Sequence, residues 1–215
     1  MEEIIKMITT YGLSIMISGV VLYFLIKVAN ILIKNYEEKN KIKKHDELAM
    51  LRNQISVTIN ALLERTALRA NADRVYVFEF HNGNTALGGL PFMKMTNTYE
   101  ALNGTAKSEM HKRTDMPFQL FQSFVDAIYN EDYIVMDVNN RTDKYSAFVY
   151  ETLVERNISV TIRAKITDIS KRVIGYFGID YCKNNPVSEA VISDSVKIAQ
   201  DVAIELGALL SVNKK

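Results

Sequence analysis

The sequence predicts an α+β fold, an α/β sandwich in which an antiparallel-rich sheet has flanking helices. Runs of β-branched and aromatic residues alternate with amphipathic helical patterns, in the order strand, strand, helix, strand, helix, strand, strand, helix. A charged, amphipathic segment without proline or glycine precedes them, and an uncharged N-terminal segment comes before that. We therefore divide the chain into a transmembrane anchor (1–33), a charged helical stalk (34–54) and a folded domain (55–215).

Composition excludes several functional classes. The 215 residues are 48% hydrophobic and 24% charged, which is typical of a folded chain. A net charge of +1 gives no general attraction to nucleic acid, so we expect no nucleic-acid partner. Cys182 is the only cysteine, which excludes an intrachain disulfide and favours a reducing compartment. Three widely spaced histidines form no metal-ligand pattern, and we predict neither a metal nor a cofactor.

Residues 7–26 contain no charged side chain, and twenty helical residues span about 30 Å, the thickness of a bilayer core. The acidic start at Glu2 and Glu3 and the lack of a cleavage site disfavour a signal peptide, and a buried soluble helix is the other alternative. Lysines are concentrated after this segment. The positive-inside rule then predicts a single-pass protein of the inner membrane, with the N-terminus outside and the C-terminal domain cytoplasmic.

The stalk and the first part of the folded domain carry one apolar stripe. Its members recur at spacings of three and four: Leu48, Leu51, Ile55, Ile59, Leu62 and Leu63. Such a stripe packs against the sheet of its own domain, or pairs with a second copy of the chain. We expect both, and hence a homo-oligomer formed through the stalk and the terminal helices.

The folded domain begins with Arg74–Phe80, a strand that we place at the centre of the sheet. Asn82-Gly83 has the composition of a tight turn, and a weaker strand follows at 92–101. Beyond it we expect a polar loop or short helix (103–116), a helix from Pro117, a strand (133–138), a helix (145–156) that stops at Asn157, strands at 159–166 and 172–182, and a long helix at 188–210.

Three stretches of this domain resemble a GAF domain: Leu62–Phe78, Leu153–Ile162 continued by Val173–Ile179, and the helix Val191–Leu210. The resemblance covers about 55–211. It implies a domain that binds a small molecule or dimerises and regulates another protein. No catalytic domain follows Leu210, so we expect the output to come from a separate protein partner.

The sequence departs from two ligand patterns of that family. Asn140-Arg141 and Phe148 match part of the cyclic-nucleotide pattern, but Glu151 lacks the aspartate that should accompany it. A bilin-binding cysteine is absent, because Cys182 falls on the last strand. The resemblance therefore implies a ligand pocket without identifying its ligand.

Strand alternation groups several polar residues on one face of the sheet, where this fold has its pocket. The candidate ligand-binding residues are Glu79, Arg163, Tyr176 and Asp180, with His81, Asn84 and Tyr99 from the adjoining turn and strand. A purely structural alternative is a buried ion pair between Glu79 and Arg163, with His81 to Asn84 as a plain turn.

No Ser–His–Asp, Cys–His or phosphate-loop arrangement is visible, so we predict no enzymatic activity. The main hypothesis is a membrane-anchored cytoplasmic GAF-like sensor or scaffold that dimerises and acts through a partner. The alternative is a holin-like or other phage membrane protein, because residues 1–48 resemble small single-span holins. In a third possibility the domain only assembles and its pocket is closed.

Overall fold

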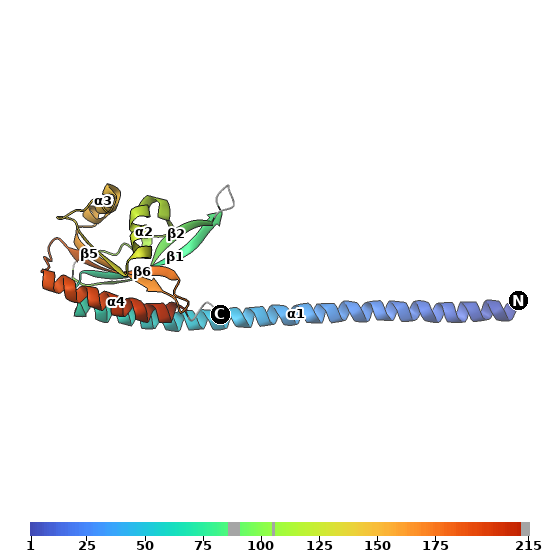
Figure 1. The fold of residues 1–215 in the computed structure, drawn as a ribbon. Helices are drawn as coiled ribbons and strands as arrows, with labels where there is room; N and C mark the ends of the chain where they lie inside the picture. The colour runs from blue at the N-terminus through green and yellow to red at the C-terminus, as the bar shows by residue number, and fades with distance from the viewer. Residues whose placement is uncertain (86–90, 105, 212–215) are drawn as a thin grey trace. The chain divides into compact units, whose positions relative to one another are not determined.

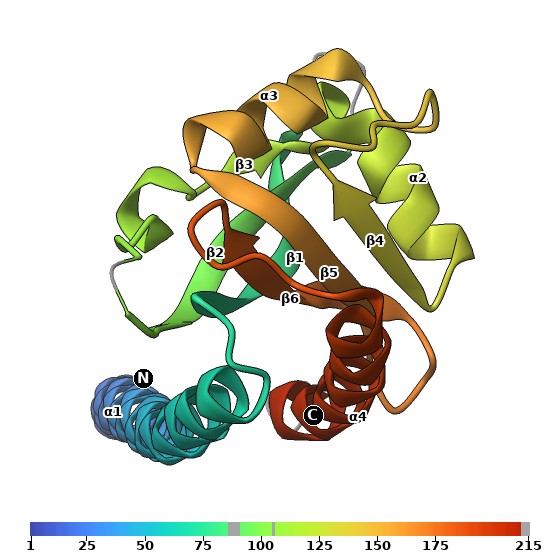
Figure 2. The ribbon, with the colours of Figure 1, turned by 90° about the vertical axis from the view of Figure 1, so that its left-hand side faces the viewer.

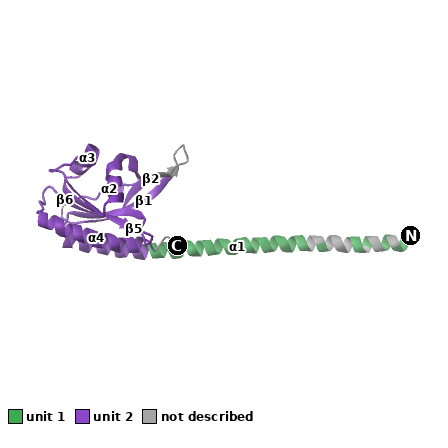
Figure 3. Ribbon diagram, viewed as in Figure 1, with its two compact units in different colours: residues 1–52 green, residues 53–215 purple. Residues whose placement is uncertain are grey.

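The computed structural model describes the backbone of residues 1–85, 91–104 and 106–211. Within that range the side chains of residues 4, 7, 8, 10, 13–17, 19–21, 84, 85, 91 and 92 are not described. Two compact units divide the chain, residues 1–52 and residues 53–215 (Figure 3). Helix α1, Glu2–Arg69, contributes to both, and unit 1 consists of its N-terminal part.

The prediction of a transmembrane anchor is contradicted. Within the described part of the chain, no helix combines the length and the apolar character that crossing a bilayer requires. Part of the predicted span, 7–26, lies outside the residues whose side chains are described. The predicted inner-membrane localisation is therefore corrected, and the holin-like alternative loses the feature on which it was based.

Unit 2 is built on a six-stranded sheet in which every neighbouring pair is antiparallel (Figure 1). Its order is β3-β2-β1-β6-β5-β4. The strands are β1 (Arg74–Thr85), β2 (Pro91–Leu102), β3 (Met116–Pro117), β4 (Tyr133–Asp137), β5 (Ile158–Thr167) and β6 (Val173–Cys182). The first strand lies inside the sheet, between β2 and β6, as the sequence predicted.

Helices cover both faces of this sheet (Figure 2). The C-terminal part of α1 and α4 (Glu189–Ser211) lie on one face, and α2 (Gln122–Asn130) and α3 (Ala147–Glu155) lie on the other. Two 3-10 helices, η1 (Met110–Lys112) and η2 (Phe118–Phe121), lie between β2 and α2 in the chain. The unit is thus a helix–sheet–helix sandwich with a hydrophobic core on each side of the sheet.

On the α1/α4 face, the predicted stripes supply the core. Ile59 and Leu63 of α1 and Leu206 of α4 are fully buried. The hydroxyl group of Tyr181 donates to the Ala70 carbonyl at 2.8 Å and lies 2.6 Å from Oγ of Ser195, so that one buried group contacts both helical segments. This face is closed mainly by apolar packing, and buried hydroxyl groups such as that of Tyr181 add polar links.

On the α2/α3 face, the core is rich in aromatic rings. Phe78 and Tyr176 stack at 4.9 Å, and Phe124 meets Tyr176 edge to face at 5.1 Å. Gly178 accommodates this cluster, because a Cβ there would lie 2.3 Å from Cζ of Tyr76. The aromatic cluster fixes the distance between the sheet and α2.

Two local predictions are wrong. Asn82 and Gly83 form no turn, since β1 continues to Thr85 and Asn82 pairs with Met93. Pro117 ends the short strand β3 and precedes η2, so the α-helix begins only at Gln122. Pairing with β2 outweighs local turn chemistry in the first case. The predicted stop at Asn157 is confirmed by its φ of 57°, directly after α3.

Candidate functional site

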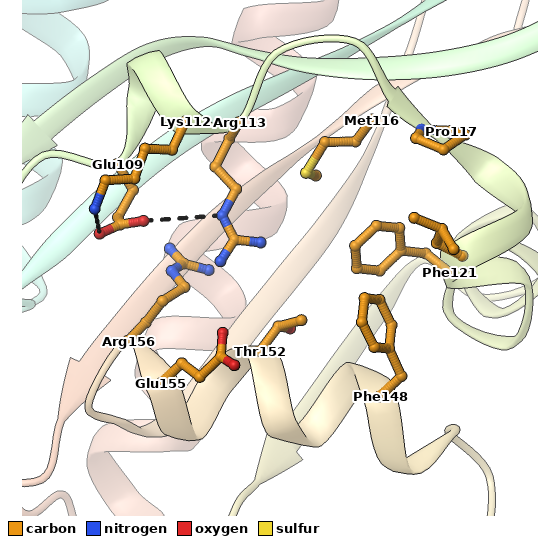
Figure 4. Close-up of a pocket in the computed structure, with 11 residues that line it drawn as sticks. Glu109, Lys112, Arg113, Met116, Pro117, Phe121, Phe148, Thr152, Glu155 and Arg156 are labelled. Carbon is orange, nitrogen blue, oxygen red and sulfur yellow. Dashed lines mark ion pairs between the residues drawn. The ribbon is translucent and has the colours of Figure 1, made fainter.

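A cavity of about 430 Å³ opens on the α2/α3 face of the sheet, between α3 and the segment that connects β2 to η2 (Figure 4). Its volume is within the range of small-molecule sites. One side is charged and the other is apolar. The lining residues are Glu109, Lys112, Arg113, Met116, Pro117, Leu120, Phe121, Phe148, Thr152, Glu155 and Arg156.

Helix α3 supplies one wall of this cavity through helical periodicity. Phe148, Thr152 and Glu155 follow one another at spacings of four and three, which places them on one side of the helix. Arg156 is the residue that ends the helix, and Asn157 then turns the chain into β5. The arginine is therefore placed where the helix, the sheet and the cavity meet.

Arg156 is held by a carboxylate at the back of the cavity. Its Nη2 donates to Oδ2 of Asp180 at 2.9 Å, and its side chain is only 6% exposed. Burial is the largest influence and acts to lower the pKa of Arg156, but Asp180 and the neighbouring tyrosines together outweigh it, so the pKa is raised. Its Nε is buried and has no hydrogen-bond partner among the described residues. Its hydrogen-bonding capacity is thus only partly used.

Asp180, on β6, is a fully buried acceptor. Its Oδ1 accepts from Thr161 at 2.6 Å and from Tyr76 at 3.0 Å. Burial alone would raise the pKa of this carboxyl, but the neighbouring guanidinium groups, with Arg156 the strongest, lower it. The carboxylate therefore stays ionised inside the domain and anchors the surrounding cations.

Arg74, the first residue of β1, is a second cation on the same carboxylate. Its Nη1 donates to Oδ2 of Asp180 at 3.3 Å, and its Nη2 donates to the Lys107 carbonyl at 2.6 Å. Its Nε lies 3.2 Å from Oε1 of Glu100, an ion pair without hydrogen-bond geometry. Arg74 is therefore shared by two buried carboxylates.

Arg163, on β5, has different partners. Its Nε donates to the Tyr76 hydroxyl at 3.2 Å, and its guanidinium lies 4.4 Å from the ring centre of Phe124 and 5.5 Å from that of Tyr176. In the described part of the chain no carboxylate forms an ion pair with it. This fully buried charge is stabilised by two aromatic faces and one hydroxyl group.

Arg113 approaches the same region from the η1 segment. The guanidinium groups of Arg113 and Arg156 lie next to each other at one end of the cavity (Figure 4). Nε of Arg113 is 4.0 Å from Oε2 of Glu109. The other carboxylate oxygen of Glu109, Oε1, is 3.6 Å from Nζ of Lys112. Burial and the positive charge of Arg156 lower the pKa of Arg113. The cavity therefore has two neighbouring cations at its charged end.

A second cavity, of about 250 Å³, adjoins the first and shares Glu109, Glu155 and Arg156 with it. Its other lining residues include Arg74, Asn157 and Cys182. Burial raises the pKa of the Cys182 thiol, so the thiol stays protonated at neutral pH. In the part of the chain that the structure describes, no group of histidine, cysteine and carboxylate side chains could hold a metal ion.

The structure separates the residues that the sequence grouped. Arg163, Tyr176 and Asp180 lie together on the α2/α3 face, since Thr161 pairs with Asp180 and Arg163 with Gly178. Glu79 pairs with Gly175, one residue from Tyr176, and therefore lies on the opposite face. The predicted common face for Glu79 and Arg163 is wrong, and so is the alternative in which these two form an ion pair.

The remaining predicted residues lie in other places. Nε2 of His81 is 2.8 Å from Oγ1 of Thr96 and 3.5 Å from Oδ1 of Asp115, on the β1–β2 pair. The hydroxyl of Tyr99 is 3.0 Å from Oγ of Ser56 on α1. The side chain of Asn84 lies outside the described residues. Neither His81 nor Tyr99 lines the cavities described above.

Sequence reasoning missed the residues that line the main cavity. Arg156 lies in the Leu153–Ile162 stretch that carries the family resemblance, but its role depends on a contact with Asp180, which is 24 residues away. Arg113 lies in a polar segment without periodicity. The one sequence signal for this cavity wall was helical spacing, because Phe148 precedes Thr152 by four residues and Arg156 by eight.

The sandwich and its cavity define a GAF-like α+β fold. The structure of a far-red cyanobacteriochrome photoreceptor is 15% identical, with a TM-score of 0.55, and the match covers 81% of this chain and 99% of that one. The GAF domain/HD domain protein from Geobacter sulfurreducens is 13% identical, with a TM-score of 0.52 and coverage of 78% and 97%. The phycocyanobilin-bound GAF domain of a cyanobacterial phytochrome is 15% identical, with a TM-score of 0.53 and coverage of 78% and 94%.

At this level of identity the likeness concerns the fold. No family model matches the sequence, and no curated protein matches it. The structural neighbours support a GAF-like fold for this chain.

Proposed function

We propose that this chain is a regulatory GAF-like module that binds a small molecule in the cavity between α3 and the η1 segment, and that it signals through a partner rather than by catalysis. The observation that carries the proposal is the cavity of about 430 Å³, where Arg113 and Arg156 lie next to each other opposite an apolar wall. A concave, mostly apolar site with a few convergent polar groups is typical of ligand binding.

A cavity-filling variant tests this function. Thr152 lines the cavity, so Thr152→Tyr places a ring in it, whereas the matched control Thr152→Ser leaves it open. The full chain is heated with and without a low-molecular-weight extract of cells. We expect the extract to raise the Tm of the wild type and of T152S, but not that of T152Y, because binding to the native state raises stability. An unchanged Tm of the wild type would refute the proposal.

We further propose that the module dimerises through the outer sides of α1 and α4. Val57 and Leu68 are 70% and 71% exposed, and both lie opposite the buried side of α1 that contains Ile59. Ile204 of α4 is 75% exposed and lies away from the sheet in the same way. Isolated exposed apolar residues are common, but these three lie on two helices that cover the same face of the sheet.

The oligomeric state tests this surface. Val57→Glu combined with Leu68→Glu should convert a dimer of the full chain into a monomer in sedimentation velocity. Leu120→Glu is the matched control, because Leu120 is 53% exposed but belongs to η2, on the other side of the sheet. A wild-type chain that sediments as a monomer at micromolar concentration would rule out this dimer.

A further inference from the structure

Buried arginines and carboxylates gather around Asp180. Three cations are buried there. Arg74 and Arg163 are 3% and 5% exposed, and the side chain of Arg156 is 6% exposed. Three buried carboxylates lie with them. Asp180 and Glu100 pair with the arginines, and Asp73, which precedes Arg74 in the chain, is 8% exposed and accepts from the Cys182 backbone N–H. The buried charges of the cluster are therefore equal in number, so an anion would have to be held at the cavity lining.

The described cavity lining has one more cation than carboxylates, with Lys112, Arg113 and Arg156 against Glu109 and Glu155. Arg113 adds a cation beside Arg156, and its only carboxylate among the described residues, Glu109, is shared with Lys112. Glu155 also lines the cavity, but it is exposed and therefore screened by solvent. Glu109 and Glu155 offset Lys112 and Arg113, and in the described part of the chain Arg156 pairs with Asp180 alone, which it shares with Arg74.

The buried cation nearest to the cavity has an unused donor. Nε of Arg156 has no hydrogen-bond partner among the described residues, although the side chain is more than nine-tenths buried. Arg163 cannot serve in the same way, because its guanidinium is enclosed by the rings of Phe124 and Tyr176 and does not line the cavity. The donors available to a ligand are therefore those of Arg113 and Arg156.

The opposite wall is apolar and aromatic. The rings of Phe121 and Phe148 lie 5.4 Å apart with an interplanar angle of 53°. Phe148 is 42% exposed, so this ring has an open face on the cavity side of α3. A flat apolar group would bury these rings, and aromatic contacts would favour it.

We propose that the ligand is an organic anion whose carboxylate or phosphate group binds between Arg113 and Arg156 and whose flat apolar body packs on Phe121 and Phe148. This inference rests on the proposed function and adds the chemical class of the ligand. Paired guanidinium groups suit both head groups, because each offers two acceptor oxygens to the planar donors. The apolar wall excludes a small inorganic anion as the preferred ligand.

Three probes of the same shape separate charge from apolar binding. Calorimetric titration of the full chain uses 2-naphthoate, 2-naphthyl phosphate and the neutral 2-naphthamide at constant ionic strength. We expect one of the two anions to bind at least tenfold more tightly than the amide, and the preferred anion identifies the head group. Inorganic phosphate should bind more weakly than 2-naphthyl phosphate.

Arg113→Gln tests the assigned cation, because this residue lies outside the Asp180 cluster and should leave the fold intact. The anion should lose at least tenfold in affinity, while the amide should be unchanged. Lys197→Gln, which removes an exposed positive charge from α4, is the control and should change neither. Without ligand, R113Q should raise the Tm by about 2 °C, because it relieves repulsion by Arg156, whereas a structural role would lower it.

The outcomes distinguish the two proposals. Equal binding of amide and anions, or unchanged anion binding in R113Q, would overturn the anionic ligand class and leave the cavity as a small-molecule site. No binding of any probe, together with no effect of cell extract on the wild-type Tm, would overturn both.

Discussion

Arg156 and Asp180 are joined by a hydrogen bond of 2.9 Å that connects the end of α3 to β6. Arg156 also lines both cavities, so the same side chain belongs to the proposed ligand site and to the buried polar cluster. Asp180 in turn holds Arg74, which begins β1 directly after the α1–β1 connection. A ligand that moved Arg156 would therefore act on a group that also fixes the first strand.

Removal of the Asp180 charge should destabilise the domain strongly. Asp180→Asn leaves Arg74 and Arg156 buried without this carboxylate, and breaking a buried pair costs about 3–5 kcal/mol. Urea denaturation of the full chain measures the loss. Asp194→Asn is the control, because Asp194 is 76% exposed and its pair with Lys197 is worth less than about 1 kcal/mol. Equal stability of both variants would contradict the assigned role of Asp180.

Acid should weaken the domain partly through Asp168. Hydrogen bonds from the Arg172 and Ser170 backbone N–H groups lower the pKa of Asp168 in the folded state. A group whose pKa is lower in the folded state stabilises the fold fully above its ordinary pKa, which for a carboxyl group is near 4. This contribution is lost as the pH falls through the folded-state pKa. Asp168→Asn should therefore be less stable than the wild type at pH 7, and the difference should shrink at pH 2–3. A constant difference across this range would exclude the charge as its cause.

Gly207→Ala should destabilise α4 although alanine favours helices. A Cβ at this position would lie 2.3 Å from the Thr167 carbonyl oxygen, so α4 would have to move away from β5. Overpacking of this kind costs about 1–3 kcal/mol. The neighbouring Ala208→Gly should cost about 1 kcal/mol through helix propensity alone. Thermal unfolding compares the two, and a stabilised G207A would show that helix and strand are not in close contact.

Tyr181→Phe should weaken the α1/α4 face. The change leaves the Ala70 carbonyl and the buried Ser195 hydroxyl without their shared partner, at a cost of about 1–3 kcal/mol. Tyr133→Phe, at a 42% exposed position of β4, should change the free energy of unfolding by less than about 0.5 kcal/mol. Chemical denaturation of both variants gives the comparison, and a neutral Y181F would mean that water replaces the hydroxyl.

Most of the elements of the domain could be predicted from local patterns. The strands from Arg74 and Ser159 and the helix that packs through Leu206 follow from periodicity of two or about 3.6, because burial of one face imposes that spacing. The hairpin between β1 and β2 was misplaced, since continued pairing as far as Thr85 depends on residues of β2 that turn chemistry does not include.

Alternation also located part of the polar cluster. Arg163, Tyr176 and Asp180 were placed on one face by counting along their own strands, and the register confirms that they share it. Glu79 was assigned to the same face, but the relative phase of two strands depends on how they pair. A shift of one residue reverses the face, and no local feature of β1 determines that phase.

The sequence by itself determined the α+β class, the inner position of the first strand and the apolar sides of the helices that flank the sheet, because periodicity and burial are properties of each segment. Only the tertiary structure decided where the cavity lies and which cations line it. Arg113, Arg156 and Asp180 come from three separate segments, and their shared electrostatics exist only at the distances that strand pairing and helix packing impose. The pairing of Arg156 with Asp180 and its closeness to Arg113 depend on these segments, and only the folded domain brings them together.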